Sequence, residues 1–478
     1  MSIETSNVGA EIGLLIERAR KAQHAIEGYS QAQADELVTS IAWSVVRQDH
    51  AEALASLAVD EGGFGNYADK VTKIRNRIMG TLADMASVKT VGIVEEIPEK
   101  GLIKIAKPVG IVAALIPTTG PDATPPLKTL LALKGRNAII IAAHPRTQKT
   151  TALVVDYMRE ACVQVGAPAD LVQLIGQPSL ARTQELMRQA DLIVATGGES
   201  MVKAAYSSGT PAYGVGVGNS VHVVDETADI ADAAKSIAAA KTFDYATSCL
   251  ADNAVVAAAD IYQGLLAALV GCGAYVCNAD EKALLKQLIW PEFAAAIPAV
   301  AVIAKPATQI AELAGFTIPE DRRFLIVEED GTGPGYPFSG EKLSVVLALY
   351  RYDDGIENAI RLVNAITDYQ GRGHTCGIHT QLDGHAMALA MATKTARVLV
   401  NQNLNEGAGS LRNGLPYTLS LSCGTWGGNI TTENVNARHF INLTWVSRPI
   451  RQLLKISTLA FLSHRRELIQ QGIPVTAR

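Results

Sequence analysis

The feature that most constrains the fold is a regular alternation of short apolar runs and longer amphipathic segments from Gly110 onward. Short apolar strands separated by helices of about ten or more residues are typical of βαβ units and a parallel sheet. The expected strands are residues 111–117, 138–143, 171–176 and 192–196, and the expected helices are 126–134, 148–165, 179–190 and 198–207. We therefore expect an α/β fold with a Rossmann-type cofactor domain and right-handed crossovers.

The composition suits this architecture and excludes several classes of protein. The 478 residues are 48% hydrophobic but only 5% aromatic, so aliphatic side chains must build the cores. A formal net charge of -5 offers no basic field to nucleic acid or an anionic membrane. The six cysteines lack zinc-ribbon or disulfide-scaffold spacing. With no signal-like segment or bilayer-spanning run evident, we expect a soluble cytoplasmic enzyme without a metal.

The regions outside the alternation predict further parts. Residues 11–57 indicate two amphipathic helices separated near Gly28, with Ser30 as an N-cap. Residues 90–108 indicate a β-hairpin, whose free edges would accept a partner strand in a homodimer or homotetramer. The expected division is a cofactor-binding domain (1–89 and 109–235), a catalytic α/β domain (236–430), an oligomerisation element (90–108 and 431–448) and a helical tail (449–478).

Cys249 is the leading candidate for a catalytic side chain. It follows a helix and a small-residue stretch and precedes an apolar strand, which places it on a connecting loop, where reactive groups are commonly carried. The thiolate is the nucleophilic form, and a free thiol titrates near ~8.5, so activation requires a nearby positive group. On local sequence alone, a small buried hydrophobic residue is the alternative interpretation.

The motifs that flank Cys249 favour the catalytic interpretation. Those before it are Ile116-Pro-Thr-Thr-Gly-Pro121, Asn137-Ala-Ile-Ile-Ile-Ala-Ala-His144-Pro-Arg146, Ala195-Thr-Gly-Gly198, Lys203-Ala-Ala-Tyr-Ser-Ser-Gly209 and Gly214-Val-Gly-Val-Gly-Asn219. Those after it are Gly373-His374-Thr375 and Ser422-Cys-Gly-Thr-Trp-Gly-Gly-Asn429. This ordered series resembles the CoA-acylating branch of the aldehyde dehydrogenase family, from about Ile12 to Asn442.

The resemblance implies a reaction sequence. Cys249 would attack an aldehyde, a nicotinamide cofactor would accept hydride, and coenzyme A would take the acyl group from the resulting thioester. Hydrolytic members of the family carry a glutamate that activates water in a Glu-Leu-Gly-Gly segment. The matching stretch 215–219 has no carboxylate, which favours transfer to a thiol over hydrolysis. His374 would lie near the CoA thiol as a second catalytic residue, with an ordinary packing histidine as the alternative.

The resemblance also implies a site for NADP or NAD. Thr196, Gly197 and Gly198 end a strand and open a helix, where backbone N–H groups can approach a phosphate. Arg146 would accommodate the 2′-phosphate of NADP; a solvated cation is the alternative. Glu341 would contact the nicotinamide ribose; a surface carboxylate is the alternative. The remaining residues of the expected cofactor site are Thr118, His144 and Gly216.

The sequence departs from this branch near the reacting atoms. Gly120 replaces an asparagine that stabilises the oxyanion in many relatives, a loss of ~3 kcal/mol that requires a substitute donor. The flanks of Cys249 are more polar than usual, which favours a polar or anionic aldehyde. The residues expected to contact this substrate are Tyr245, Ser248, Asn253 and Arg412.

The guanidinium of Arg412 suits bidentate capture of an anion, although a surface loop charge is the alternative. Within the branch, the pattern is most similar to enzymes for sulfoacetaldehyde, followed by those for succinate semialdehyde or acetaldehyde. A hypothesis of another class is an assembly or shell-associated protein that docks through its basic C-terminal helix.

Overall fold

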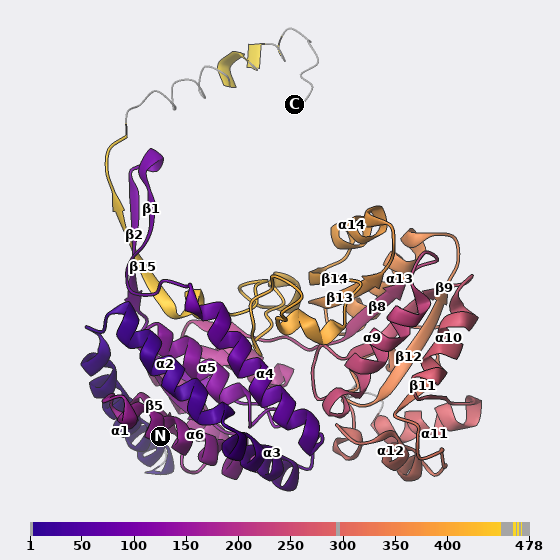
Figure 1. Cartoon of the computed structure of the whole chain (residues 1–478), viewed down its shortest axis with the longest axis horizontal. Coiled ribbons are helices and arrows are strands. Elements are labelled where there is room, and N and C mark those ends of the chain that lie inside the picture. Colours follow the sequence, from indigo (N-terminus) through magenta and orange to yellow (C-terminus); the bar gives the residue numbers. More distant parts are fainter. Residues whose placement is uncertain (1–2, 293–296, 451–461, 465, 468–469, 471–478) are drawn as a thin grey trace.

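The computed structural model describes residues 3–292, 297–450, 462–464, 466–467 and 470. Two parallel sheets, each covered by helices, form the body, and a small antiparallel sheet projects from one side (Figure 1). The expected α/β fold is therefore confirmed. Among the described residues, no helix combines the length and apolarity needed to cross a bilayer.

The first parallel sheet has five strands in the order β5-β4-β3-β6-β7. Its strands are β3 (Ile111–Leu115), β4 (Ala138–Ala142), β5 (Val172–Leu174), β6 (Leu192–Ala195) and β7 (Ala212–Gly214). The central strand β3 is buried at every residue, as expected for a parallel strand covered on both faces. The four predicted strands are all present, whereas β7 was not predicted.

Eight helices pack with this first sheet. They are α1 (Ile3–Ile26), α2 (Gln31–Val46), α3 (Gln48–Gly62), α4 (Tyr67–Ala86), α5 (Thr124–Lys134), α6 (Gln148–Gln164), α7 (Leu180–Gln189) and α8 (Glu199–Tyr206). Ser30 caps α2, as predicted, and forms a reciprocal capping box with Gln33. The predicted second helix is interrupted at Arg47, whose extended ψ of 145° separates α2 from α3.

The second parallel sheet has seven strands in the order β10-β11-β12-β9-β8-β13-β14. Its strands are β8 (Ser220–Val224), β9 (Asp252–Ala258), β10 (Ala274–Val276), β11 (Phe324–Glu328), β12 (Val346–Tyr352), β13 (Gly373–His379) and β14 (Thr395–Val400). Its helices are α9 (Ile230–Thr242), α10 (Tyr262–Gly271), α11 (Ala279–Ile289), α12 (Ala307–Ala314), α13 (Ile356–Tyr369) and α14 (Asp383–Ala392). Strand β8 lies between β9 and β13, although the expected domain division placed residues up to 235 with the first sheet.

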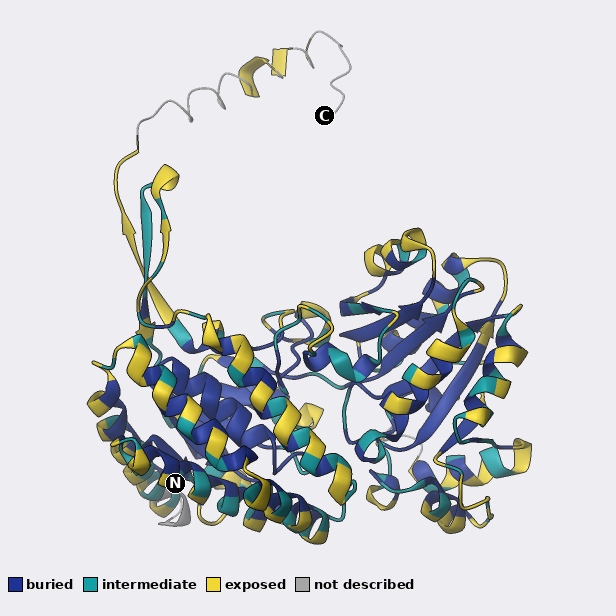
Figure 2. Ribbon diagram, viewed as in Figure 1, coloured by how far each residue is buried: buried dark blue, intermediate teal, exposed yellow. Residues whose placement is uncertain are grey.

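The projecting sheet joins two distant segments of the chain. The predicted hairpin forms β1 (Gly92–Ile97) and β2 (Leu102–Pro108), and β15 (Ile441–Ser447) pairs antiparallel with β2. Lys104 lies over the ring of Trp445 at 4.5 Å. Much of this sheet is exposed (Figure 2). The predicted tail helix falls largely outside the described residues.

Candidate active site

A cavity of about 780 Å³ lies between the two parallel sheets. The first sheet lines it with segments that follow the carboxyl ends of β3, β4 and β6, including Thr118, His144 and Thr196. The second sheet lines it with segments that precede the amino ends of β8, β9 and β12, including Cys249 and Glu341. A ligand in this cavity would contact both domains.

Most of the predicted site residues line this cavity. They are Thr118, His144, Arg146, Thr196, Gly197, Gly198, Gly216, Ser248, Cys249 and Glu341. Residues more than 220 positions apart in the chain, such as Thr118 and Glu341, therefore lie on one surface, as their assignment to a single site requires.

Four predicted site residues do not line the cavity. Asn253 is buried in β9 and accepts a hydrogen bond from the Lys342 backbone N–H at 3.0 Å. Arg412 is largely exposed, and its guanidinium lies 3.7 Å from the Glu406 carboxylate. Tyr245 lies in the short 3-10 helix η4 (Phe243–Ala246) that precedes the nucleophile loop. Substrate contacts by these three residues stay predictions.

His374 is the fourth, and it is fully buried at the start of β13. Neither ring nitrogen has a hydrogen-bond partner in the described part of the chain. Burial, together with the nearby Arg397 charge, lowers the pKa of His374 to about 3, so the ring is neutral across the physiological range. Its catalytic role stays a prediction, and this burial favours the packing alternative.

Cys249 is positioned by an unusual backbone turn. Asp244, Tyr245 and Ala246 have φ values of 49°, 51° and 61°, the left-handed region that side chains with a Cβ seldom adopt. Each such residue costs about 1–2 kcal/mol, so surrounding contacts must hold the turn in place. The turn ends immediately before Thr247, Ser248 and Cys249, which all line the cavity.

The buried carboxylate of Asp244 anchors this turn to the first domain. Its Oδ2 lies 2.8 Å from the Lys73 ammonium, 3.3 Å from that of Lys70 and 2.8 Å from the Thr247 hydroxyl. Its Oδ1 accepts the Asn66 backbone N–H at 3.0 Å. Burial alone would raise the pKa of Asp244, but the two lysines and the hydrogen bonds lower it overall. A charged Asp244 therefore pins the turn to helix α4.

The electrostatic surroundings of Cys249 keep its thiol protonated. Burial, with the charges of Glu341 and Cys423, raises the pKa of Cys249 to about 12, although Arg397 acts in the opposite direction. Burial raises the pKa of Glu341 to about 8. Arg397 is itself buried and donates to backbone carbonyls, including that of Ser422 at 2.7 Å. The predicted nucleophile therefore requires a further change, such as ligand binding, before it can ionise.

The Thr124 hydroxyl lies beside Gly120, the position at which many relatives carry an asparagine. A Cβ at Gly120 would lie 2.6 Å from the Thr124 hydroxyl oxygen, and both residues line the cavity. The Thr124 hydroxyl forms no side-chain hydrogen bond with any residue that the structure describes. It therefore occupies the space into which a side chain at position 120 would project, with its proton free to donate.

The first-sheet side of the cavity has room for a nucleotide. A Cβ at Gly198, the N-cap of α8, would meet no atom within 4 Å. Backbone N–H groups at this helix start can therefore be approached closely by an anion. The Arg146 guanidinium lies 5.2 Å from the centre of the Phe64 ring, and its backbone N–H donates to His144 Nδ1 at 3.2 Å. These residues fit a dinucleotide with its phosphates at Gly197 and Gly198.

Several cavity residues were not predicted, among them Lys73, Arg77 and Thr124. Lys73 and Arg77 are four positions apart on α4 and so share a helix face. Thr124 follows Gly120 by the same interval, and its backbone N–H donates to the Gly120 carbonyl. The four-residue spacing indicates that the two α4 side chains share a helix face. It does not indicate that this face meets the second domain, so the sequence alone could not place them in the cavity.

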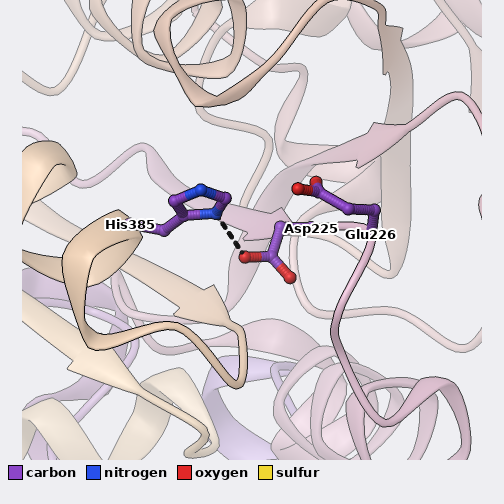
Figure 3. Close-up of side chains that lie close together, drawn as sticks. All are labelled: Asp225, Glu226 and His385. Carbon is purple, nitrogen blue, oxygen red and sulfur yellow. Dashed lines mark hydrogen bonds and ion pairs between the residues drawn. The ribbon is translucent and has the colours of Figure 1, made fainter.

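A separate polar cluster lies away from the cavity, at the carboxyl end of β8. Asp225, Glu226 and His385 are the one described group of three side chains close enough to share a metal ion (Figure 3). His385 Nδ1 lies 2.8 Å from Asp225 Oδ2, and Thr227 donates its N–H and hydroxyl to Asp225 Oδ1. Both Asp225 oxygens are already hydrogen-bonded. Because His385 belongs to α14 and Asp225 follows β8, these bonds stabilise the packing of α14 against the sheet.

Comparisons with known proteins agree with this geometry. The model of the "Aldehyde dehydrogenase family" matches residues 5–272. A sulfoacetaldehyde dehydrogenase of Acholeplasma sp is 44% identical over 435 residues, 90% of each chain. The crystal structure of an acetylating aldehyde dehydrogenase from Geobacillus thermoglucosidasius has a TM-score of 0.90 at 38% identity, covering 94% of this chain and 99% of that one.

A propionaldehyde dehydrogenase from Rhodopseudomonas palustris, solved with bound CoA and an acylated cysteine, has a TM-score of 0.82 at 26% identity. The match covers 91% of this chain and 97% of that one. Sequence relatives and solved structures lead to the same assignment. The chain belongs to the aldehyde dehydrogenase family.

Proposed function

We propose that this protein is a CoA-acylating aldehyde dehydrogenase whose preferred substrate is sulfoacetaldehyde. The observation that carries the proposal is the position of Cys249 in a cavity with Glu341 as the one carboxylate among its described lining residues. The stretch from Val215 to Gly218, which also lines the cavity, contains no base to activate water. The similarity to a sulfoacetaldehyde dehydrogenase and to acetylating enzymes supports the same reaction.

The residues of this chain would act in sequence. The Cys249 thiol would pass its proton to water and its sulfur would add to the aldehyde carbon, forming a thiohemiacetal whose oxygen carries negative charge. The Cys249 backbone N–H and the Thr124 hydroxyl would donate to that oxygen, so Thr124 replaces the missing asparagine amide. Bound NAD(P) supplies the hydride acceptor that converts this adduct to a thioester. The CoA thiol then attacks the thioester and releases Cys249.

The cofactor would lie along the carboxyl ends of β3, β4 and β6. Gly197 and Gly198 would receive its phosphates, and Glu341 would contact the ribose nearest Cys249. Arg146 would receive the 2′-phosphate of NADP, because a guanidinium binds phosphate oxygens well. Replacing Arg146 by alanine should then raise KM for NADP much more than KM for NAD.

The projecting sheet would join copies of this chain into a homodimer or homotetramer. β15 is an edge strand with six consecutive exposed residues after Ile441, including Leu443 and Trp445. An exposed edge with apolar side chains favours pairing with another chain. Size-exclusion chromatography with light scattering on a Trp445→Lys variant would test this: the wild type should be oligomeric and the variant smaller.

The central experiment measures NAD(P)H formation from sulfoacetaldehyde, succinate semialdehyde and acetaldehyde, with and without CoA. We expect sustained turnover only with CoA and the highest kcat/KM for sulfoacetaldehyde. The Cys249→Ala variant should lose at least about 10⁴-fold in rate while its oligomeric state is unchanged. Sustained turnover without CoA would indicate a hydrolytic enzyme instead. Full activity of Cys249→Ala would contradict the assignment of Cys249 as the nucleophile, whereas a wild type that forms no NAD(P)H from any of the three aldehydes would favour the assembly hypothesis.

A further inference from the structure

Arg77 on helix α4 brings a positive charge to the wall of the cavity. Its Nη1 donates to the Gly409 carbonyl at 2.8 Å and to the Ala408 carbonyl at 3.2 Å, and its Nη2 donates to the Asn405 carbonyl at 2.8 Å. These acceptors are neutral, so they fix the guanidinium in place without cancelling its charge. Arg77 is therefore a rigidly held cation beside the cavity.

The neighbouring lysine on the same helix face shows the contrast. Lys73 also lines the cavity, but it lies 2.8 Å from Asp244 and 3.6 Å from Asp122, so its charge is neutralised. Arg77 forms no ion pair with any residue that the structure describes. Burial accordingly lowers the pKa of Arg77, although Tyr417 and Glu406 partly offset this effect. A partly buried cation without a counter-ion is costly, and an anionic ligand would relieve that cost.

Arg77 lies close to the nucleophile through a small apolar cluster. Cys249 packs against a cluster formed by Val215, Leu250, Ala408 and Leu421. The Ala408 carbonyl of this cluster is the group to which Arg77 donates. Because both residues line the cavity and share Ala408 as a neighbour, a short substrate is the one that this arrangement favours: the charged group of a two-carbon ω-anionic aldehyde is only two bonds from the carbon that the sulfur attacks.

Ser248 adds a second donor on the same wall. Its hydroxyl oxygen accepts the Leu250 N–H at 3.2 Å, which fixes the oxygen and leaves the hydroxyl proton without an acceptor in the described structure. Ser248 lines the cavity immediately before the nucleophile. A fixed guanidinium and an unused hydroxyl beside Cys249 form a recognition site for an oxyanion.

We infer that Arg77, assisted by Ser248, binds the anionic group of the substrate and sets the preference for short ω-anionic aldehydes, so that sulfoacetaldehyde is favoured over the longer succinate semialdehyde. This inference rests on the proposed function and assigns its specificity to a residue outside the reacting centre. Arg412, expected to take this role, is exposed and lies near Glu406 instead.

The test compares kcat/KM for sulfoacetaldehyde and acetaldehyde in Arg77→Met, Arg77→Lys and wild-type protein. The sulfoacetaldehyde-to-acetaldehyde ratio should fall about 100-fold in Arg77→Met, as expected for loss of a charged hydrogen-bonding partner. It should fall about 10-fold in Arg77→Lys, which keeps the charge but loses the planar fork. Arg75→Met is the matched control, because Arg75 is an exposed residue on the same helix and should leave the ratio unchanged.

A binding readout keeps the inference separate from the proposed function. Ethanesulfonate should protect Cys249 from alkylation by iodoacetamide in the wild type and in Arg75→Met, but not in Arg77→Met or Arg77→Lys at the same concentration. If the wild type does not oxidise sulfoacetaldehyde, the proposed function fails while this protection still tests Arg77. Equal protection in wild type and both Arg77 variants, with melting temperatures that show they are folded, would overturn the inference. The inference would also be overturned if the sulfoacetaldehyde-to-acetaldehyde ratio of kcat/KM fell in Arg412→Met and stayed at the wild-type value in Arg77→Met.

Discussion

The two parallel sheets of this protein turn opposite ends toward the same cavity. The five-stranded sheet presents the carboxyl ends of β3, β4 and β6, where helices begin and backbone N–H groups point outward. The seven-stranded sheet presents the amino ends of β8, β9 and β12, which the chain reaches through loops. The carboxyl end of β8 instead carries the cluster of Asp225, Glu226 and His385 (Figure 3).

Because of this difference, the first sheet supplies the ligand-binding side of the site and the second sheet supplies the nucleophile. Ligands of open parallel sheets bind at the carboxyl ends of the strands, and the first sheet follows that rule. The second sheet departs from it, so its side of the site depends on long-range anchoring rather than on helix starts. Cys249 is held by a left-handed turn, which is fixed by Asp244 through lysines of the first domain.

Removing the anchor should damage the nucleophile side most. Asp244→Ala leaves Lys70 and Lys73 without their shared carboxylate, which should destabilise the folded state by about 3–5 kcal/mol and abolish turnover. Because the pKa of Asp244 is lowered in the folded state, wild type keeps this stabilisation above the ordinary aspartate range and loses it only in acid. Urea unfolding measures the change.

The control for this prediction is Asp49→Ala, which removes an exposed carboxylate from the surface pair with Arg47. Exposed pairs contribute little, so its unfolding midpoint should match that of the wild type. If Asp244→Ala is equally stable and active, the left-handed turn does not need its anchor, and the proposed division of the site is wrong.

Removing a donor on the first-sheet side should affect chemistry without affecting stability. Thr124→Val deletes the hydroxyl that faces the space beside Gly120 and should lower kcat about 100-fold. Thr124→Ser keeps the donor and should stay within about threefold of the wild type, since removal of a methyl group is a small change. Steady-state kinetics measures both variants, and a Thr124→Val enzyme with wild-type kcat would exclude Thr124 as an oxyanion donor.

Glu341→Gln should make the thiol more reactive. Ionised Glu341 raises the pKa of Cys249, so the neutral amide should lower that pKa and raise the thiolate fraction about threefold for each half unit of pKa. The pKa of Glu341 is about 8, so the difference should be present near about pH 9.5 and absent near about pH 6. Iodoacetamide alkylation rates measure it; a pH-independent ratio would mean that the Glu341 charge does not act on Cys249.

The smallest expected effect on catalysis is at the opposite edge of the second sheet. Asp225→Asn removes the charge that holds His385 and Thr227, which should cost about 1–3 kcal/mol of stability. The kcat should stay within about twofold of the wild type, because this edge does not line the cavity. A large loss of kcat, or a change of activity on adding a chelator, would reassign this edge to function.

The sequence was sufficient for the fold class and for the family, because strand and helix periodicity and ordered motifs are local properties. It was insufficient for β7, whose three residues end in glycine and carry little pattern. The domain division at residue 235 also differed from the sheets. The apolar pattern of a strand such as β8 is the same in either sheet. Its sheet is determined by its pairing with β9 and β13, which are distant in the sequence.

The same limit applies to the cavity. Most of the predicted residues line it because their motifs surround strand ends. Arg77 and Thr124 did not stand out, because their importance depends on a facing domain. Arg412 was predicted because it is an arginine in a family motif, but it does not line the cavity, whereas Arg77, on a helix far earlier in the chain, does.

The hairpin has a consequence for how the gene can change. Strand β2 ends at Pro108, and after Val109 and Gly110 the same backbone becomes β3, the middle strand of the first sheet. Gly110 adopts a φ of 117° and would clash with Asp191 if it carried a side chain. An insertion or deletion at this junction would shift the outward strand against the inward one. Reading-frame-preserving length changes should therefore be tolerated at the hairpin tip near Glu99 and selected against at residues 108–111.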